Sequence, residues 1–108
     1  MSDIFKRTQM LLGSDAIRKL GASAVAVFGV GGVGGYVAEG LARCAVGEIT
    51  LIDNDTISVT NINRQIIATI SSVGKMKTHV VKERLLDINP KMKVNTSEMF
   101  ILPENADE

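Results

Sequence analysis

The sequence predicts an α/β protein built on a Rossmann-like parallel sheet, with the organisation of the N-terminal half of a doubly wound domain. Two observations support this prediction. A short apolar, β-branched run over residues 23–29 predicts a buried parallel strand. This run ends in glycine and leads into a helical pattern over residues 32–47. A second apolar run over residues 48–53 then ends on an acid, Asp53. A strand, a glycine loop, a helix and a strand in this order form a βαβ unit.

Three further segments complete the expected organisation. Residues 14–21 predict a short helix with Ser14 or Asp15 as its cap. Residues 74–90 carry an apolar stripe at helical spacing and predict a longer helix, whereas residues 93–100 suit a third strand. A parallel sheet needs cover on both faces, and these segments supply few helices for that purpose.

Composition and charge restrict the class of protein. Twelve basic residues balance twelve acidic ones among 108, so we expect no general attraction to nucleic acid or anionic membranes. The single cysteine, Cys44, excludes an internal disulfide framework and fits a reducing compartment, and we expect its thiol to be buried. No apolar run approaches the roughly 20 residues of a membrane span, and the N-terminus lacks an apolar signal segment. We therefore expect a cytoplasmic protein and one partial domain over residues 1–108.

The glycines after the first predicted strand indicate a nucleotide-binding loop. Gly29, Gly31 and Gly34 fit the pattern G-x-G-x-x-G, and Gly32 is an additional glycine within it. Such glycines permit a tight turn, close approach of phosphate to the backbone, and close packing of helix on strand. Asp53, at the end of the next strand, suits the hydroxyls of a ribose. These features alone fit either NAD or ATP.

The residues after Asp53 favour ATP. Asp55 follows two positions later, and the segment 60–65 reads "TNINRQ". Lys75 and Lys77 then begin the next predicted helix, where a cation is unfavourable against the helix dipole unless an anion binds there. A triphosphate and its departing pyrophosphate require more fixed positive charge than the pyrophosphate of NAD does.

Three segments together resemble a known family. "GVGGVGGYVAEGLAR", "LIDNDTISVTNINRQ" and "VGKMK" are similar to the ThiF/MoeB/HesA family, whose members are relatives of the ubiquitin-activating enzymes. The resemblance covers roughly residues 5–100 and implies carboxylate adenylation with ATP and Mg²⁺, usually by a homodimer. It places this chain in the ATP-binding N-terminal half of the adenylating domain. The metal-associated aspartate and the part that recognises the acceptor are expected beyond residue 108, and the chain alone is expected to be inactive.

The resemblance also implies roles for individual residues. The nucleotide-binding set comprises Gly29, Gly31, Gly32, Gly34, Asp53, Asp55, Asn61, Arg64 and Lys77. The catalytic set comprises Arg64 and Lys77, with Arg7 reaching into the site of the partner subunit. Gln65 is expected to brace the loop rather than to contact the nucleotide. No metal ligand is assigned within the chain.

The acceptor is suggested by two short segments. "FKRTQMLLG" near the start and "VTNINRQI" over residues 59–66 look most like the family branch that dehydrates threonylcarbamoyladenosine in tRNA. This resemblance implies tRNA as substrate and adenylation of the threonyl carboxylate, followed by ring closure. Activation of the C-terminal glycine of a ubiquitin-like sulfur carrier, with a sulfur-transfer partner, is the alternative within the family. An NAD-dependent oxidoreductase and a nucleotide-binding fragment without turnover are alternatives from other classes.

Overall fold

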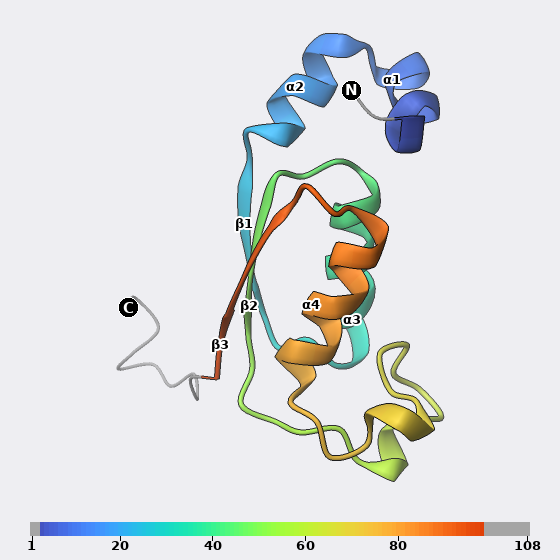
Figure 1. Ribbon diagram of the computed structural model, residues 1–108, viewed down its shortest axis with the longest axis vertical. Coiled ribbons are helices and arrows are strands. Elements are labelled where there is room, and N and C mark those ends of the chain that lie inside the picture. Colours follow the sequence, from blue (N-terminus) through green and yellow to red (C-terminus); the bar gives the residue numbers. More distant parts are fainter. Residues whose placement is uncertain (1–2, 99–108) are drawn as a thin grey trace.

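The computed structural model describes residues 3–98 of the chain. The helices are α1 (Lys6–Leu12), α2 (Ser14–Gly21), α3 (Gly32–Arg43) and α4 (Lys77–Ile88), and the strands are β1 (Ala24–Phe28), β2 (Glu48–Ile52) and β3 (Lys93–Ser97) (Figure 1). Three short 3₁₀ turns are η1 (Asp3–Phe5), η2 (Val59–Asn61) and η3 (Ile70–Ser72). Residues 99–100 of the predicted third strand lie outside the described residues. None of the helices within residues 3–98 is long and apolar enough to cross a membrane.

The three strands form one parallel sheet in the order β1-β2-β3. The strands pair in register, so that Val27 lies opposite Leu51 and Leu51 lies opposite Thr96. Helix α3 connects β1 to β2, and α4 precedes β3. The predicted βαβ unit and the α/β fold class are thereby confirmed.

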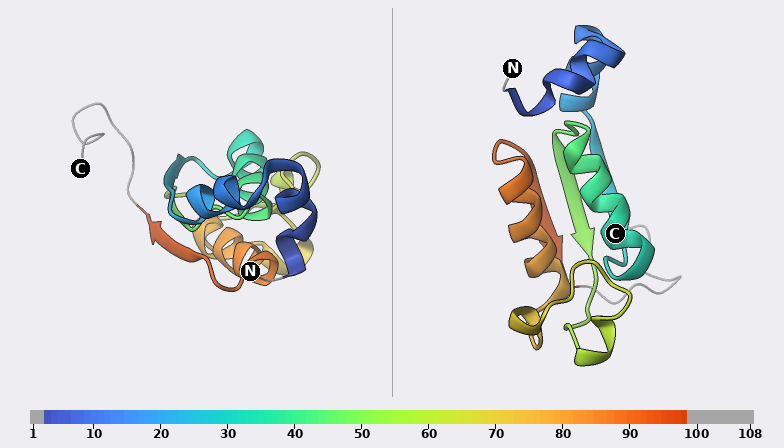
Figure 2. Two further views of the ribbon diagram at one scale, coloured as in Figure 1. Left: turned by 90° about the horizontal axis from the view of Figure 1, so that it is seen from above. Right: turned by 90° about the vertical axis from the view of Figure 1, so that its right-hand side faces the viewer.

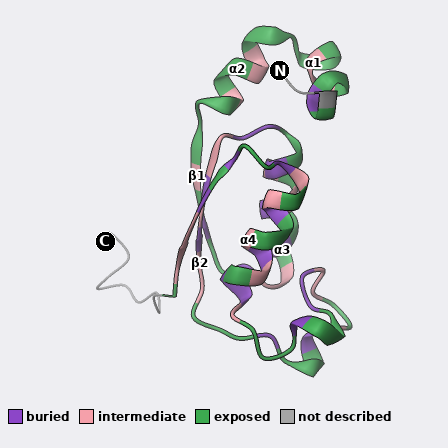
Figure 3. Cartoon of the chain, viewed as in Figure 1, coloured by how far each residue is buried: buried purple, intermediate pink, exposed green. Residues whose placement is uncertain are grey.

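The core lies between one face of the sheet and the helices α3 and α4, which pack side by side (Figure 2). Alternate strand residues point into it because successive side chains of a strand face opposite sides. Figure 3 shows the buried segments gathered on the inner sides of these elements. The core residues of the strands are Val27, Ile49, Leu51 and Val94, and those of the two helices are Ala38, Ala42, Val81 and Leu85.

The expectation that the first strand is buried was wrong. Within β1 only Val27 is buried, and Phe28 is 55% exposed. The physical reason is that α3 and α4 cover the same face of the sheet, and among residues 3–98 no helix covers the other face (Figure 2). Ala24, Ala26 and Phe28 lie on that open face.

Two helices are shorter than the sequence suggested. Helix α3 ends at Arg43 rather than at residue 47, since Ala45 has φ of 69° and turns the chain out of helical geometry. Cys44 follows the last helical residue and is exposed, so the expectation of a buried thiol was also wrong. Helix α4 begins only at Lys77, because Met76 is extended and forms an isolated bridge with Thr56.

The N-terminal helices differ from the prediction in their first residues and in number. The cap of α2 is Gly13, and Asp15 accepts a hydrogen bond from the side chain of Arg18 at 2.9 Å instead of capping the helix. Helix α1 was not predicted. It has no buried residue, and therefore the sequence carries no amphipathic pattern that would reveal it.

Helices α3 and α4 are joined by a charged cluster centred on Glu39. The Glu39 carboxylate accepts hydrogen bonds from Nε of Arg84 on α4 and, at 3.2 Å, from Nε of Arg43 on its own helix. The Glu39 side chain is only 16% exposed. The hydrogen bond from Arg84 holds the pKa of the Glu39 carboxyl below its usual value despite the opposing effect of burial, and Arg43 lowers it further.

The contacts of Glu39 with Arg84 and Arg43 should make the free energy of unfolding depend on pH. The carboxylate stabilises the fold above the ordinary glutamate pKa, and this contribution disappears as the pH falls through the lowered pKa. Glu39→Gln should lower the unfolding free energy at neutral pH, and its difference from the parent should shrink below about pH 4. Urea unfolding at several pH values measures the effect. A difference that stays constant with pH would contradict it.

Candidate nucleotide-binding site

The candidate site lies at the carboxyl ends of β1 and β2. Open parallel sheets bind their ligands at this edge. The loop after β1 leads directly into α3, and the long segment between β2 and α4 gathers at the same end of the molecule (Figure 1). The loop is tied to the neighbouring strand, because the backbone N–H of Gly29 donates to the carbonyl of Ile52 at 2.8 Å.

The glycines of this loop are required for different physical reasons. Gly29 and Gly32 have φ of 81° and 37°, in the region that glycine adopts without strain. Gly34 lies so close to the end of β1 that a Cβ placed there would be 1.7 Å from the carbonyl oxygen of Gly29. This close approach brings the start of α3 to the end of the strand. The first N–H groups of α3 have no acceptor within the helix and, together with the helix dipole, suit an anion.

Asp53 ties the glycine loop to the segment that follows β2. Its Oδ2 accepts a hydrogen bond from the backbone N–H of Val30, and its Oδ1 accepts one from that of Asp55, both at 2.9 Å. Each carboxylate oxygen has a further lone pair available for a hydroxyl. Asp53 therefore has a structural role that sequence reasoning missed, and it can still accept hydrogen bonds from a ribose.

Asn61 and Arg64 shape the loop that contains them. Asn61 is 7% exposed, and its Oδ1 accepts a hydrogen bond from the N–H of Ser58 at 2.9 Å. The exposed Arg64 side chain donates through Nη1 to the carbonyl of Thr60 at 2.8 Å. In this arrangement the guanidinium of Arg64 is folded onto its own loop.

Lys77 is a nearly buried cation at the start of α4. Its side chain is 8% exposed, and Nζ lies 3.8 Å from Oδ2 of Asp55. The backbone N–H of Lys77 also donates to the carbonyl of Asp55 at 3.0 Å. Asp55 itself is 65% exposed, so the buried ammonium has a carboxylate partner that can move towards solvent. Lys75, by contrast, is an exposed loop residue.

Arg7 is not brought to this site within the chain. It lies on α1, at the opposite end of the sheet from the glycine loop (Figure 1). The other predicted residues follow the carboxyl ends of β1 and β2 or begin α4. Within residues 3–98, no group of three or more His, Cys, Asp or Glu side chains is arranged to hold a metal ion.

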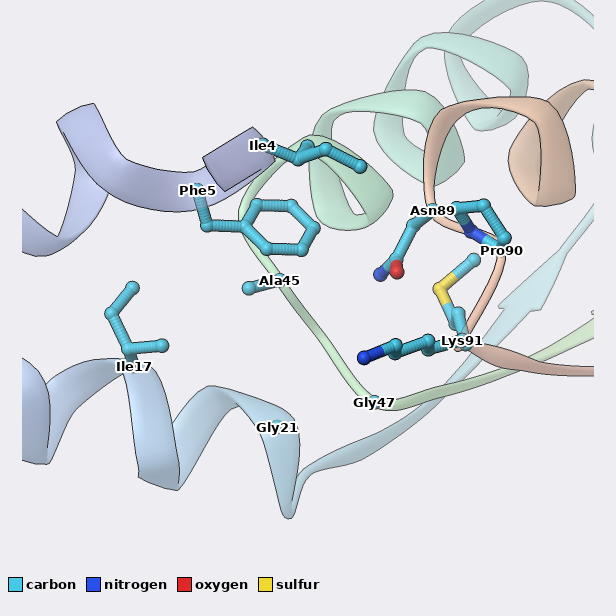
Figure 4. Close-up of a pocket in the computed structure, with 10 residues that line it drawn as sticks. Ile4, Phe5, Ile17, Gly21, Ala45, Gly47, Asn89, Pro90 and Lys91 are labelled. Carbon is cyan, nitrogen blue, oxygen red and sulfur yellow. The ribbon is translucent and has the colours of Figure 1, made fainter. Parts of the chain in front are cut away.

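A pocket of about 460 Å³ lies at the amino ends of the strands, away from the glycine loop (Figure 4). Its walls include Phe5 of η1, Ile17 of α2 and Met92 before β3. It is mostly apolar and contains none of the predicted nucleotide-binding residues. The chemical groups suited to phosphate are therefore at the opposite end of the sheet from this pocket.

The fold is Rossmann-like, and the glycine loop at the carboxyl edge of its sheet is a candidate nucleotide-binding site. The ThiF family model matches residues 5–108, and the chain belongs to this family. It is 43% identical over 104 residues to the tRNA threonylcarbamoyladenosine dehydratase of Bacillus subtilis, covering 96% of this chain and 41% of that protein. It is 42% identical over 94 residues to the adenylyltransferase and sulfurtransferase UBA4 of Lodderomyces elongisporus, covering 87% of this chain and 21% of that protein.

The fold is likewise similar to a solved structure with a bound nucleotide. The crystal structure of Escherichia coli tRNA N6-threonylcarbamoyladenosine dehydratase, TcdA, in complex with ATP superposes with a TM-score of 0.93 at 42% identity, covering 96% of this chain and 44% of that chain. The chain thus spans about two fifths of the length of the dehydratases that it matches.

Two alanine substitutions on α3 should have opposite effects. Gly34→Ala should destabilise the fold by about 3 kcal/mol or more, because its Cβ would overlap the carbonyl of Gly29. A Cβ built on Gly40 would have no neighbour within 4 Å among the described residues. Gly40→Ala should therefore stabilise α3 by about 0.5–1 kcal/mol. Denaturant unfolding measures both values, and equal effects would contradict the close approach at Gly34.

Proposed function

We propose that this protein adenylates a carboxylate with ATP and that the described chain forms the ATP-binding N-terminal half of its adenylating domain. The observation that carries this proposal is the nearly buried Lys77 beside Asp55, at the same edge of the sheet as the glycine loop and the start of α3. A fixed cation next to an anion-binding helix start suits a triphosphate better than NAD, whose pyrophosphate needs little more than the loop itself.

In this proposal the chain acts mainly by positioning the nucleotide and stabilising charge. The N–H groups of Gly32 and Gly34 bind phosphate oxygens, and Asp53 accepts hydrogen bonds from the ribose. The attack of the acceptor carboxylate on the α-phosphate releases pyrophosphate and leaves an acyl-adenylate. Lys77 and Arg64 stabilise the charge that develops on the phosphates, and for this Arg64 must turn away from the carbonyl of Thr60.

The side-chain amide nitrogen of Asn61 is proposed to bind the nucleotide. Its Oδ1 is engaged by Ser58, so its Nδ2 is the group that would donate to phosphate. Asp55 assists by holding Lys77. Mg²⁺ would neutralise charge on the phosphates, and the aspartate that the resemblance associates with the metal is expected beyond residue 108.

The acceptor that the similarities favour is the threonyl carboxylate of threonylcarbamoyladenosine in tRNA. The support is the identity of 43% to a protein with that named activity and the likeness to TcdA in complex with ATP. After adenylation, attack on the activated carbonyl within the same nucleoside would close a ring with net loss of water. The similarity to UBA4 supports, as a second candidate, adenylation of the C-terminal glycine of a ubiquitin-like sulfur carrier.

We further propose a cytoplasmic homodimer in which Arg7 completes the site of the partner. Arg7 lies at the far end of the sheet from its own glycine loop, and this position supports a role in the site of a second copy (Figure 1). Met10 and Leu11 on the same helix are 77% and 85% exposed, which is typical of a surface that another chain covers.

Substitution of two neighbouring lysines tests the role of Lys77. Lys77→Met in the intact protein should weaken ATP binding and lower adenylation by about a hundredfold, because a fixed cation near the phosphates is lost. Lys75→Met removes an equal charge from an exposed position two residues away and should change both by less than about twofold. Calorimetric titration with ATP and with NAD measures binding. Equal affinities of the two variants for ATP, or tighter binding of NAD, would contradict adenylation.

The acceptor is tested by exchange of labelled pyrophosphate into ATP. The intact protein should catalyse exchange when tRNA carrying threonylcarbamoyladenosine is added, because adenylation is reversible at that step. Unmodified tRNA is the matched control and should give none. Exchange that appears only with a ubiquitin-like carrier would assign the second candidate function instead.

A further inference from the structure

The side chain of Gln65 lies directly on the glycine loop. A Cβ built on Gly31 would be 2.8 Å from Oε1 of Gln65 and 2.9 Å from its Nε2. Real Cβ atoms do not approach other atoms so closely, so this amide occupies the space that any side chain at position 31 would need. Gly31 is also the residue that caps α3. The amide of Gln65 therefore lies against the residue where the chain turns into the helix.

The backbone of Gln65 is itself held on both sides. Its N–H donates to the carbonyl of Asn61 at 2.9 Å, and its carbonyl accepts from the N–H of Ala68 at 3.0 Å. These bonds belong to the compact loop after η2, which also contains Arg64. The backbone from which the Gln65 side chain extends is thus fixed by the loop.

The amide oxygen of Gln65 is buried and has no hydrogen-bond partner among residues 3–98. A buried acceptor without a partner destabilises a fold, whereas an apolar side chain of the same shape in its place is neutral or stabilising. Methionine has nearly the same length and would fill the space beside Gly31 equally well. Packing alone therefore does not account for a glutamine at this position.

We propose that Gln65 is a positioning residue of the nucleotide site, with an amide that fixes Gly31 and an Oε1 that accepts a hydrogen bond only when the nucleotide is bound. This inference rests on the proposed function. Phosphate oxygens are acceptors, so the donor to Oε1 is either a ribose hydroxyl or a water ordered by the phosphates. In both cases the bond forms in the bound state and contributes to affinity rather than to the stability of the free protein.

Replacement of the amide by an apolar side chain of similar length separates these two contributions. In the intact protein, Gln65→Met should leave the melting temperature unchanged or raise it, and should weaken ATP binding about tenfold, the loss expected for one hydrogen bond. The matched control is Gln9→Met on α1, where Gln9 donates to Ser14 at 2.8 Å. This control should lower the melting temperature slightly and leave ATP affinity unchanged.

Inorganic tripolyphosphate distinguishes the two donors. If a ribose hydroxyl donates, Gln65→Met should bind tripolyphosphate as the parent does, whereas a phosphate-ordered water predicts weaker binding of both ligands. Unchanged ATP affinity in Gln65→Met would overturn the inference. A lower melting temperature would also overturn it, because the amide would then already be paired in the free protein. A parent protein that fails to bind ATP would overturn the proposed function, and this inference with it.

Discussion

The structure depends on the close approach of α3 to the end of β1. The carbonyl of Gly29 and the α-carbon of Gly34 lie so near each other that no side chain fits between them. This approach orients the start of α3 at the carboxyl edge of the sheet. Asp53 then fixes the loop by accepting the N–H of Val30, so strand, loop and helix form one rigid unit. This unit holds the first N–H groups of α3, which suit an anion, at the carboxyl edge of the sheet.

The helices of the described chain that cover the sheet form a single layer against it. Helices α3 and α4 lie on a single face of the sheet and are linked through Glu39 and Arg84. On the opposite face, Nδ2 of Asn95 donates a hydrogen bond to Oε2 of Glu48 at 2.8 Å. Two polar side chains of this uncovered surface are thus paired with each other. Parallel sheets are normally covered on both faces. The one-sided cover agrees with the proposal of a partial domain and with relatives more than twice as long as this chain.

The sequence predicted the elements whose pattern is set by local periodicity and glycine. The βαβ unit follows from the apolar runs that end at Gly29 and Asp53, and the long helix before β3 follows from the apolar stripe over residues 74–90. It did not predict α1, which buries none of its residues, or the exposure of Cys44, which depends on where α3 ends. A helix end fixed by a positive φ at Ala45 has no signal in residue type, because alanine favours helices.

Within the candidate site, residue identity was easier to predict than residue contact. The carboxylate of Asp53 could be selected by charge and spacing, whereas Lys77 was selected over Lys75 by the family resemblance. The assigned roles of both residues stay predictions. The bonds from Val30 to Asp53 and from Ser58 to Asn61 could not be foreseen, because they depend on the path of the loop. The contact of Gln65 with Gly31 is likewise tertiary, since it joins residues 34 positions apart in the chain.

We propose above all that this protein activates a carboxylate of a modified tRNA nucleoside with ATP. The most direct measurement incubates the intact protein with MgATP and tRNA carrying threonylcarbamoyladenosine, followed by digestion and mass spectrometry of the nucleosides. We expect an ATP-dependent loss of one water from that nucleoside. An unchanged nucleoside, in the presence of an intact protein that binds ATP, would contradict it.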